Sequence, residues 1–146
     1  MQFKPSYIAN NQAVTFSGLN SLASGSTVWS SAIDNTSNLD ADHLMAGGFT
    51  TNAAGTSSTG TITILIAASV DGGSTYNTNV NNAKVLAVVT ANANATVYNL
   101  DPSSIAAFFG GMLPPLYKIG VTNNTGAALS GSGNSMFYER ESELLV

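Results

Sequence analysis

The chain has 146 residues, a length that fits one domain able to bury a core without metal ions or disulfides. Its 4 basic and 8 acidic residues give a formal net charge of −4, and the scattered cations form no basic stripe that would neutralise nucleic-acid phosphates. There is no cysteine, which excludes thiolate chemistry and cysteine-based metal sites, and no apolar run is long enough to span a membrane.

Uncharged polar residues dominate the chain. Serine, threonine, asparagine and glycine together supply 63 of the 146 residues. A surface of hydroxyl and amide groups repels its neighbours weakly and offers many hydrogen bonds, which favours packing against other protein. The opening "MQFKPSYIANNQAV" lacks the apolar segment of a signal peptide, so we expect synthesis in a cytoplasm without export.

Residues 1–20 predict an N-terminal arm. Their larger apolar side chains follow no regular period and are too few to form a core of their own. We expect the arm to hold at most one strand and to contact a neighbouring subunit or shell through Phe3, Tyr7, Ile8 and Phe16. The rest of the chain is expected to form a β-sandwich domain over residues 21–140 and a short C-terminal tail over residues 141–146.

Short apolar runs separated by turn residues fill the rest of the chain. The segment "DPSSIAAFFGGMLPP" predicts one helical turn, with Pro102 in its first turn and Gly110 and Gly111 ending it. Seven or eight short strands with a turn about every eight to twelve residues predict an all-β fold, an antiparallel β-sandwich resembling a jelly roll. The strands are expected at about 27–33, 41–50 and 61–70, twice within 84–100 around a loop at "ANAN", from about 116, and in "SMFYERESELLV".

The strongest strand signal is "TITILIAASV". Alternate positions from Ile62 to Val70 share a face that belongs in the core. The opposite face, on alternate positions from Thr61 to Ser69 that include Leu65 and Ala67, is weakly polar, and we expect another subunit to cover part of it. The "DGG" that follows predicts a tight hairpin, because Asp-Gly supplies the positive φ that such turns require.

The segment "LDADHL" brings Asp40, Asp42 and His43 together, and it is the one place where the histidine meets carboxylates. In an extended strand the two aspartates share a face and His43 points away, so a three-ligand metal site would need a turn there. A hydrogen-bonded structural histidine is the favoured interpretation.

Other candidate sites are also weak. "DGGSTYNTN" lacks the carboxylates of a calcium loop, and the chain has neither a G-x-S-x-G elbow nor a facing pair of carboxylates on its central strands. The sequence therefore predicts no enzyme, no catalytic residue, no cofactor and no metal. Trp29 would suit a sugar-stacking platform with nearby tyrosines, but a single tryptophan on an alternating strand more often indicates a core residue.

Four segments carry a resemblance to a known family: "SLASGSTVWSSAIDNTSNL", "SVDGGSTY", "AFFGGMLPPLYKIGVTNNTGAAL" and "MFYER". In this order, across residues 21–140, they resemble small virion proteins of tailed bacteriophages. The resemblance implies a jelly-roll module of the kind that decorates or cements phage heads or forms parts of tails and fibres. It implies no catalytic residues.

The expected function is that of a capsid decoration or cement protein, located in the virion, which binds the outer head surface and stabilises the shell. The expected partners are the major capsid protein and further copies of the chain, as a homotrimer, because the resemblance points to shells with threefold positions. Neither nucleic acid nor a membrane is expected as a partner. The alternative is a tail or fibre module that attaches to host glycans, and a carbohydrate-binding accessory of an enzyme comes third because no secretion signal is present.

Overall fold

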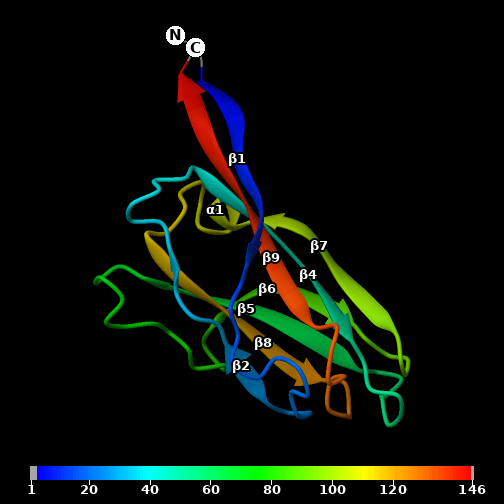
Figure 1. Cartoon of the computed structure of the whole chain (residues 1–146). Coiled ribbons are helices and arrows are strands. Elements are labelled where there is room, and N and C mark those ends of the chain that lie inside the picture. Colours follow the sequence, from blue (N-terminus) through cyan, green and yellow to red (C-terminus); the bar gives the residue numbers. More distant parts are fainter. Residues whose placement is uncertain (1–2, 146) are drawn as a thin grey trace.

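The structure is a computed structural model that describes residues 3–145, with side chains described for residues 6–143. It is almost entirely β, which confirms the predicted fold class. In this part of the chain no helix has the length and apolar character that crossing a membrane requires. The elements are β1 (Phe3–Ala13), β2 (Thr27–Trp29), β3 (Ile33–Asp34), β4 (Asp42–Thr50), β5 (Thr61–Ser69), β6 (Lys84–Thr90), β7 (Val97–Ser104), α1 (Ile105–Phe108), β8 (Leu116–Asn124) and β9 (Ser135–Leu145) (Figure 1).

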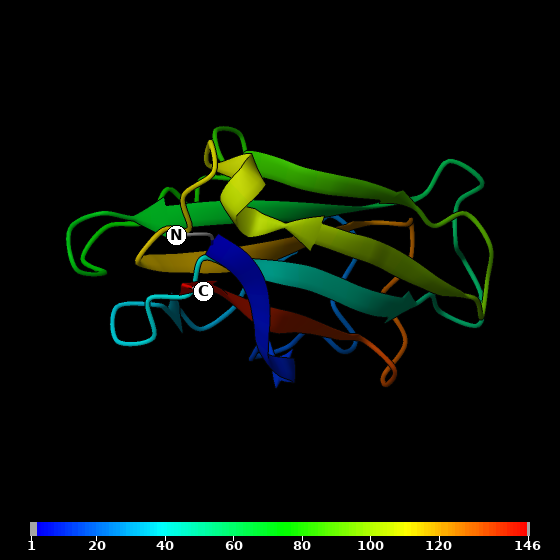
Figure 2. The same ribbon diagram turned by 90° about the horizontal axis from the view of Figure 1, so that it is seen from above.

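The strands form two antiparallel sheets, one in the order β1-β9-β4-β7 and the other in the order β2-β8-β5-β6, with β3 also paired to β8. Because β2 and β3 both pair with β8, they act as two pieces of one interrupted strand, and the two orders are then those of a jelly roll. The loops gather at two opposite ends of the sandwich (Figures 1 and 2). Loops 35–41 and 70–83 lie at one end, and loops 51–60 and 125–134 lie at the other.

The core lies between the sheets and is built by alternating residues. In β5, Ile62, Ile64 and Ile66 point inward as predicted, and each is almost fully buried. Burying a side chain of this size stabilises the fold by roughly 1.5–3 kcal/mol. Their main partners in the core are Met45, Phe49, Leu100, Tyr117, Ile119, Val121 and Met136. Val70 was expected on the same face but lies beyond the end of β5 and is 92% exposed.

The strand predicted at 27–33 is broken at Ser30. The hydroxyl oxygen of Ser30 accepts a hydrogen bond from the backbone N–H of Ile119. In a continuous ladder, a backbone carbonyl of the neighbouring strand would accept this bond. A side chain that substitutes for the backbone in this way ends β2 and allows β3 to start separately. This break accounts for nine strands where seven or eight were predicted.

The predicted arm and tail belong to the sandwich, so the boundaries expected at residues 20 and 140 do not separate domains. β1 pairs with β9 along its length, from Phe3 opposite Leu145 to Ala13 opposite Phe137. Two register shifts interrupt this pairing and hide the alternation that would have revealed β1 as a strand. Beyond Glu141, β9 no longer pairs with β4, and the two terminal strands project as a two-stranded ribbon (Figure 1).

The helical turn forms where expected but begins later. Ser104 is its N-cap, accepting a hydrogen bond from the backbone N–H of Ala107. Pro102 therefore lies in β7 and not in the first turn, which corrects the prediction. Gly110 and Gly111 follow the helix with φ of 79° and 94°, as expected for residues that end it.

The tight hairpin predicted after β5 is not formed. Gly72 and Gly73 do have positive φ, but the connection to β6 extends over residues 70–83. The Asp71 carboxylate accepts hydrogen bonds from the Ser69 hydroxyl and the Thr75 N–H. These bonds fold the segment into a local turn within a longer loop, which replaces the strand-to-strand hairpin.

Candidate functional site

His43 lies in a hydrogen-bonded network between the sheets. Its Nδ1 is 2.7 Å from the hydroxyl of Tyr117 in β8, and its Nε2 is 2.9 Å from a carboxylate oxygen of Asp40. Asp40 also accepts hydrogen bonds of 2.6 and 3.0 Å from the guanidinium of Arg140 in β9. The Asn35 side-chain amide donates a hydrogen bond to the backbone carbonyl of Asp40 and accepts one from the Asp40 backbone N–H. Because the network joins β4, β8 and β9, it ties one sheet to the other.

Burial and hydrogen bonding set the charges in this network. Burial lowers the pKa of His43, although the Asp40 carboxylate opposes that shift. Burial alone would raise the pKa of Asp40, but hydrogen bonds from Arg140 and His43 outweigh it, so the pKa is lowered. Burial, the largest cause, raises the pKa of Tyr117 far above its usual value. At neutral pH the neutral His43 ring therefore donates from Nε2 to the Asp40 carboxylate and accepts from Tyr117 at Nδ1.

This arrangement stabilises the fold and offers no open catalytic group. Asp40 and His43 are both buried, and the hydrogen-bonding atoms of both side chains are in use. The nearby Asp42 carboxylate accepts hydrogen bonds from Ser104 and from the N–H of Ala106, so it fixes α1 against β4. Within residues 3–145, His, Asp and Glu form no group of three that is placed to hold a metal ion. The geometry agrees with the interpretation of His43 as a structural residue.

A lateral row of residues crosses the outer face of the five-stranded sheet. The register places Trp29, Gly120, Leu65 and Val85 next to one another across β2, β8, β5 and β6. The Trp29 ring lies on Gly120, because a Cβ added there would be 2.9 to 3.0 Å from three of its ring atoms. Trp29 is therefore on the outer face, and the prediction that it belongs to the core is wrong.

The neighbouring row of this face is rich in threonine. Thr27, Thr122 and Thr63 lie side by side, followed by Val88 at the edge in β6. The hydroxyls of Thr27 and Thr122 are 2.6 Å apart and share a hydrogen bond. Neither row contains a charged residue, so the two rows consist of methyl, hydroxyl and aromatic groups.

The chain itself covers part of this outer face. Tyr76, from the loop after β5, lies under Lys118, whose Nζ is 4.6 Å from the ring centroid. Lys118 pairs with Ala67, which is 3% exposed, and Leu65 beside Trp29 is 2% exposed. Intramolecular packing thus protects these two residues, for which the sequence suggested cover by another subunit. The open part of the face is the edge formed by β6.

The four predicted contact residues do not form one surface. Tyr7 and Ile8 lie at the first register shift of β1 and are 53% and 44% exposed. Phe16 instead packs against the core and forms an isolated bridge with Ser30. The backbone of Phe3 is part of the projecting ribbon, and its side chain lies outside the described part of the structure.

Sequence reasoning missed the lateral row because it considered each strand separately, whereas the row depends on register across four strands. One usable signal was present in "KIGVT", where Gly120 interrupts an alternating strand. A glycine inside a strand often marks a place where another group approaches the backbone closely, as the Trp29 ring does here.

No family model and no curated protein matches the chain. The assignment of a function therefore starts from the fold and from the surfaces described above.

Proposed function

We propose that the protein is a structural protein of a tailed-bacteriophage virion, of the decoration or cement type, which binds the outer surface of the head. The observation that carries this proposal is the pair of uncharged rows on the outer face of the five-stranded sheet, which end at the exposed Val85 and Val88 in β6. Such a face meets little electrostatic repulsion when it packs against another protein. Jelly rolls occur among viral capsid and lectin domains, which supports the proposal by analogy of fold.

The free edge of β6 supports contact with other subunits. β6 ends the five-stranded sheet, so one side of its backbone has no ladder partner among the described strands, and Lys84 is its one charged residue. Uncovered edges with so little charge tend to pair with other chains, and closed symmetric association covers them. We therefore propose self-association as a homotrimer together with binding to the major capsid protein.

The projecting ribbon of β1 and β9 offers a second contact. A two-stranded ribbon is marginally stable in water when nothing packs on it. Its outer half, from Phe3 to Ser6 and from Ser142 to Leu145, pairs only within the ribbon among the described residues. Contact with a shell surface would stabilise it. This proposal transfers the role expected of residues 1–20 to the ribbon as a whole.

Two valines form a matched pair for a test of this function. Val88 in β6 is 58% exposed on the outer face of the five-stranded sheet, and Val97 in β7 is 59% exposed on the outer face of the other. We expect Val88→Glu to weaken binding to heads stripped of the protein by more than about 100-fold, because a carboxylate desolvated without a partner costs several kcal/mol. Val97→Glu should bind like the wild type.

Co-sedimentation with stripped heads measures the binding, and light scattering measures the oligomeric state. Equal binding by the two variants would contradict the placement of the contact on the five-stranded sheet. Failure of the wild-type protein to bind heads at all would contradict the proposed function itself. A monodisperse monomer would contradict the trimer.

A further inference from the structure

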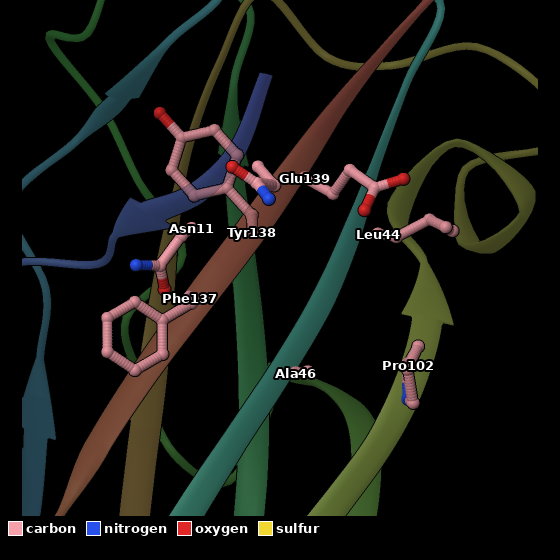
Figure 3. A pocket seen from close by; sticks show the side chains of 8 residues that line it. Asn11, Leu44, Ala46, Pro102, Phe137, Tyr138 and Glu139 are labelled. Carbon is pink, nitrogen blue, oxygen red and sulfur yellow. The ribbon is translucent and has the colours of Figure 1, made fainter. Parts of the chain in front are cut away.

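The outer face of the four-stranded sheet contains a hollow of about 500 Å³ that draws side chains from all four strands (Figure 3). Phe137 and Asn11 lie at one end of it and Pro102 at the other, with Leu44 and Ala46 between them. A volume of this size lies within the usual range for small-ligand sites. The proposed contacts with a phage head lie on the five-stranded sheet and on the outer half of the β1–β9 ribbon, outside this hollow.

The hollow lies where the strands are irregular. Between the pairs Ala9 with Arg140 and Gln12 with Tyr138, two asparagines of β1, Asn10 and Asn11, lie opposite the single residue Glu139. Another register shift lies in the β4–β7 pairing, where two residues of β7, Asp101 and Pro102, lie opposite the single residue Ala46. Bulges of this kind redirect side chains and are frequent next to binding sites.

Asn11 has an unusual backbone conformation. Its φ is 55°, in the left-handed region that residues with a side chain seldom adopt, although asparagine tolerates it better than most. A left-handed residue is a usual feature of one class of β-bulge, and here it accompanies the two asparagines that share Glu139 as their partner. The effect of the bulge is to bring a second amide side chain to the rim of the hollow.

The polar side chains at this end of the hollow are Asn10, Asn11 and Glu139. Among the residues with described side chains, neither the Asn10 and Asn11 amides nor the Glu139 carboxylate has a hydrogen-bond partner, and both asparagines are exposed. An amide both donates and accepts hydrogen bonds, and a carboxylate accepts strong ones. These three groups together suit a ligand whose own groups both donate and accept hydrogen bonds, as hydroxyl groups do.

Phe137 supplies an apolar surface beside these polar groups. Its neighbour Met136 points into the core, so Phe137 points outward, where it lies opposite the small side chain of Ala13. Figure 3 shows its ring close to Asn11. The face of an aromatic ring carries partial negative charge, which attracts the slightly positive C–H groups on the face of a pyranose ring.

We propose that this hollow binds a neutral sugar of one or two pyranose rings. Phe137 stacks on one ring face, and Asn10, Asn11 and Glu139 form hydrogen bonds with ring hydroxyls. An anionic ligand is disfavoured because no positively charged side chain lines the hollow within residues 6–143, and one carboxylate is too few for a cation site. Many copies on one particle would turn weak single contacts into firm attachment to a glycan-coated surface.

The test is a titration of the isotopically labelled full chain, followed by ¹H–¹⁵N NMR, with lactose, maltose and N,N′-diacetylchitobiose. Each sugar is added to about 50 mM, well above the millimolar dissociation constant expected for a shallow site. At least one of the three should shift the backbone signals of Asn11, Ala46 and Phe137 together with the side-chain amide signals of Asn10 and Asn11. No shift at these residues with any of the three sugars would overturn the proposal.

Variants locate the site. Phe137→Ala should weaken binding about tenfold or more, with Phe137→Leu as a second variant if the first does not fold. Asn11→Gly removes the amide while suiting the left-handed φ, so it should weaken binding without lowering stability. Tyr76→Ala removes an aromatic ring on the opposite face and should leave binding unchanged.

Wild-type affinity in Phe137→Ala and Phe137→Leu, or shifts centred on Trp29, would place the sugar elsewhere and overturn the assignment. Binding of stripped heads is measured separately and uses the other face. Failure of the sugar site is therefore distinguishable from failure of the proposed structural function.

Discussion

The two outer faces of the sandwich differ in regularity, although both cover the same core. Across the five-stranded sheet, Trp29, Gly120, Leu65 and Val85 form one row, and the register shift of this sheet lies at its edge, between β5 and β6. Across the four-stranded sheet, shifts in β1 and β7 break the rows at three places, and a hollow lies beside two of them. The more regular face suits packing against another protein, whereas the less regular one has the shape and the unpaired groups that a small ligand needs.

The two faces also differ in charge. All three glutamates of the chain, Glu139, Glu141 and Glu143, alternate along β9, and Glu141 lies opposite Asp42. Burial raises the pKa of Glu141, and the neighbouring Asp42 and Glu139 add to that shift. The rows of the five-stranded sheet carry no such group. Self-repulsion at the acidic strand therefore favours the proposed protein contact on the two uncharged rows of the five-stranded sheet.

The largest expected effect is a loss of folding, and it tests which side of β5 faces the core and which faces outward. Ile64 and Thr63 are adjacent in β5 and point to opposite sides. Ile64→Asp should prevent folding, because a buried carboxylate without a partner costs several kcal/mol. Thr63→Asp should fold and lose less than about 1 kcal/mol. Urea denaturation followed by circular dichroism measures both, and equal losses would refute the assignment.

The inner face could be predicted from the sequence because its signal is local. Ile62, Ile64 and Ile66 recur at every second position, with a threonine before each of the first two, and a period of two in one strand is enough to identify a buried face. The fold class follows from the number of such strands. The position of Trp29 could not be predicted in this way, because it depends on Gly120, which is 91 residues away in the chain and adjacent only through β2–β8 pairing.

The terminal strands and the hollow were missed for a related reason. Bulges shift a strand by one residue, so β1 shows no steady alternation and resembles an arm when read alone. Phe3, Tyr7, Ile8 and Phe16 were grouped by their position in the sequence, and the structure separates Phe16 from the others. The buried network could be foreseen only in part, since "LDADHL" contains Asp40 and His43 but not Tyr117 and Arg140.

A smaller loss of stability is expected when glycine is replaced by alanine, and it should differ between the two outer faces. Gly120→Ala places a methyl group against the Trp29 ring, and we expect a loss of about 1–3 kcal/mol with a red shift of Trp29 fluorescence as the ring moves into water. Gly48→Ala, on the four-stranded sheet, meets only the Asn99 side chain at 3.3 Å and should cost less than about 1 kcal/mol. Unchanged fluorescence in Gly120→Ala would show that the ring does not rest on that glycine.

The smallest expected effect is a pH dependence of stability, caused by the buried His43 network that joins the two sheets. His43 is the one histidine of the chain, and burial lowers its pKa in the folded state. Below about pH 6.5, the usual pKa of histidine, the unfolded chain therefore binds a proton that the folded chain does not. Stability should be greatest above this pH and should fall as the pH decreases towards the lower folded pKa.

Other groups change stability at lower pH, so a variant is needed to isolate His43. Asp40, whose pKa is also lowered, adds to the loss below about pH 4, whereas Glu141, whose pKa is raised, contributes stability at low pH that is lost as the pH rises through its folded pKa. His43→Gln keeps a hydrogen-bonding side chain but cannot titrate between pH 5 and 6.5. Urea denaturation at several pH values should show a slope in this window for the wild type and none for the variant. The same slope in both proteins would mean that His43 does not link the sheets as a neutral ring.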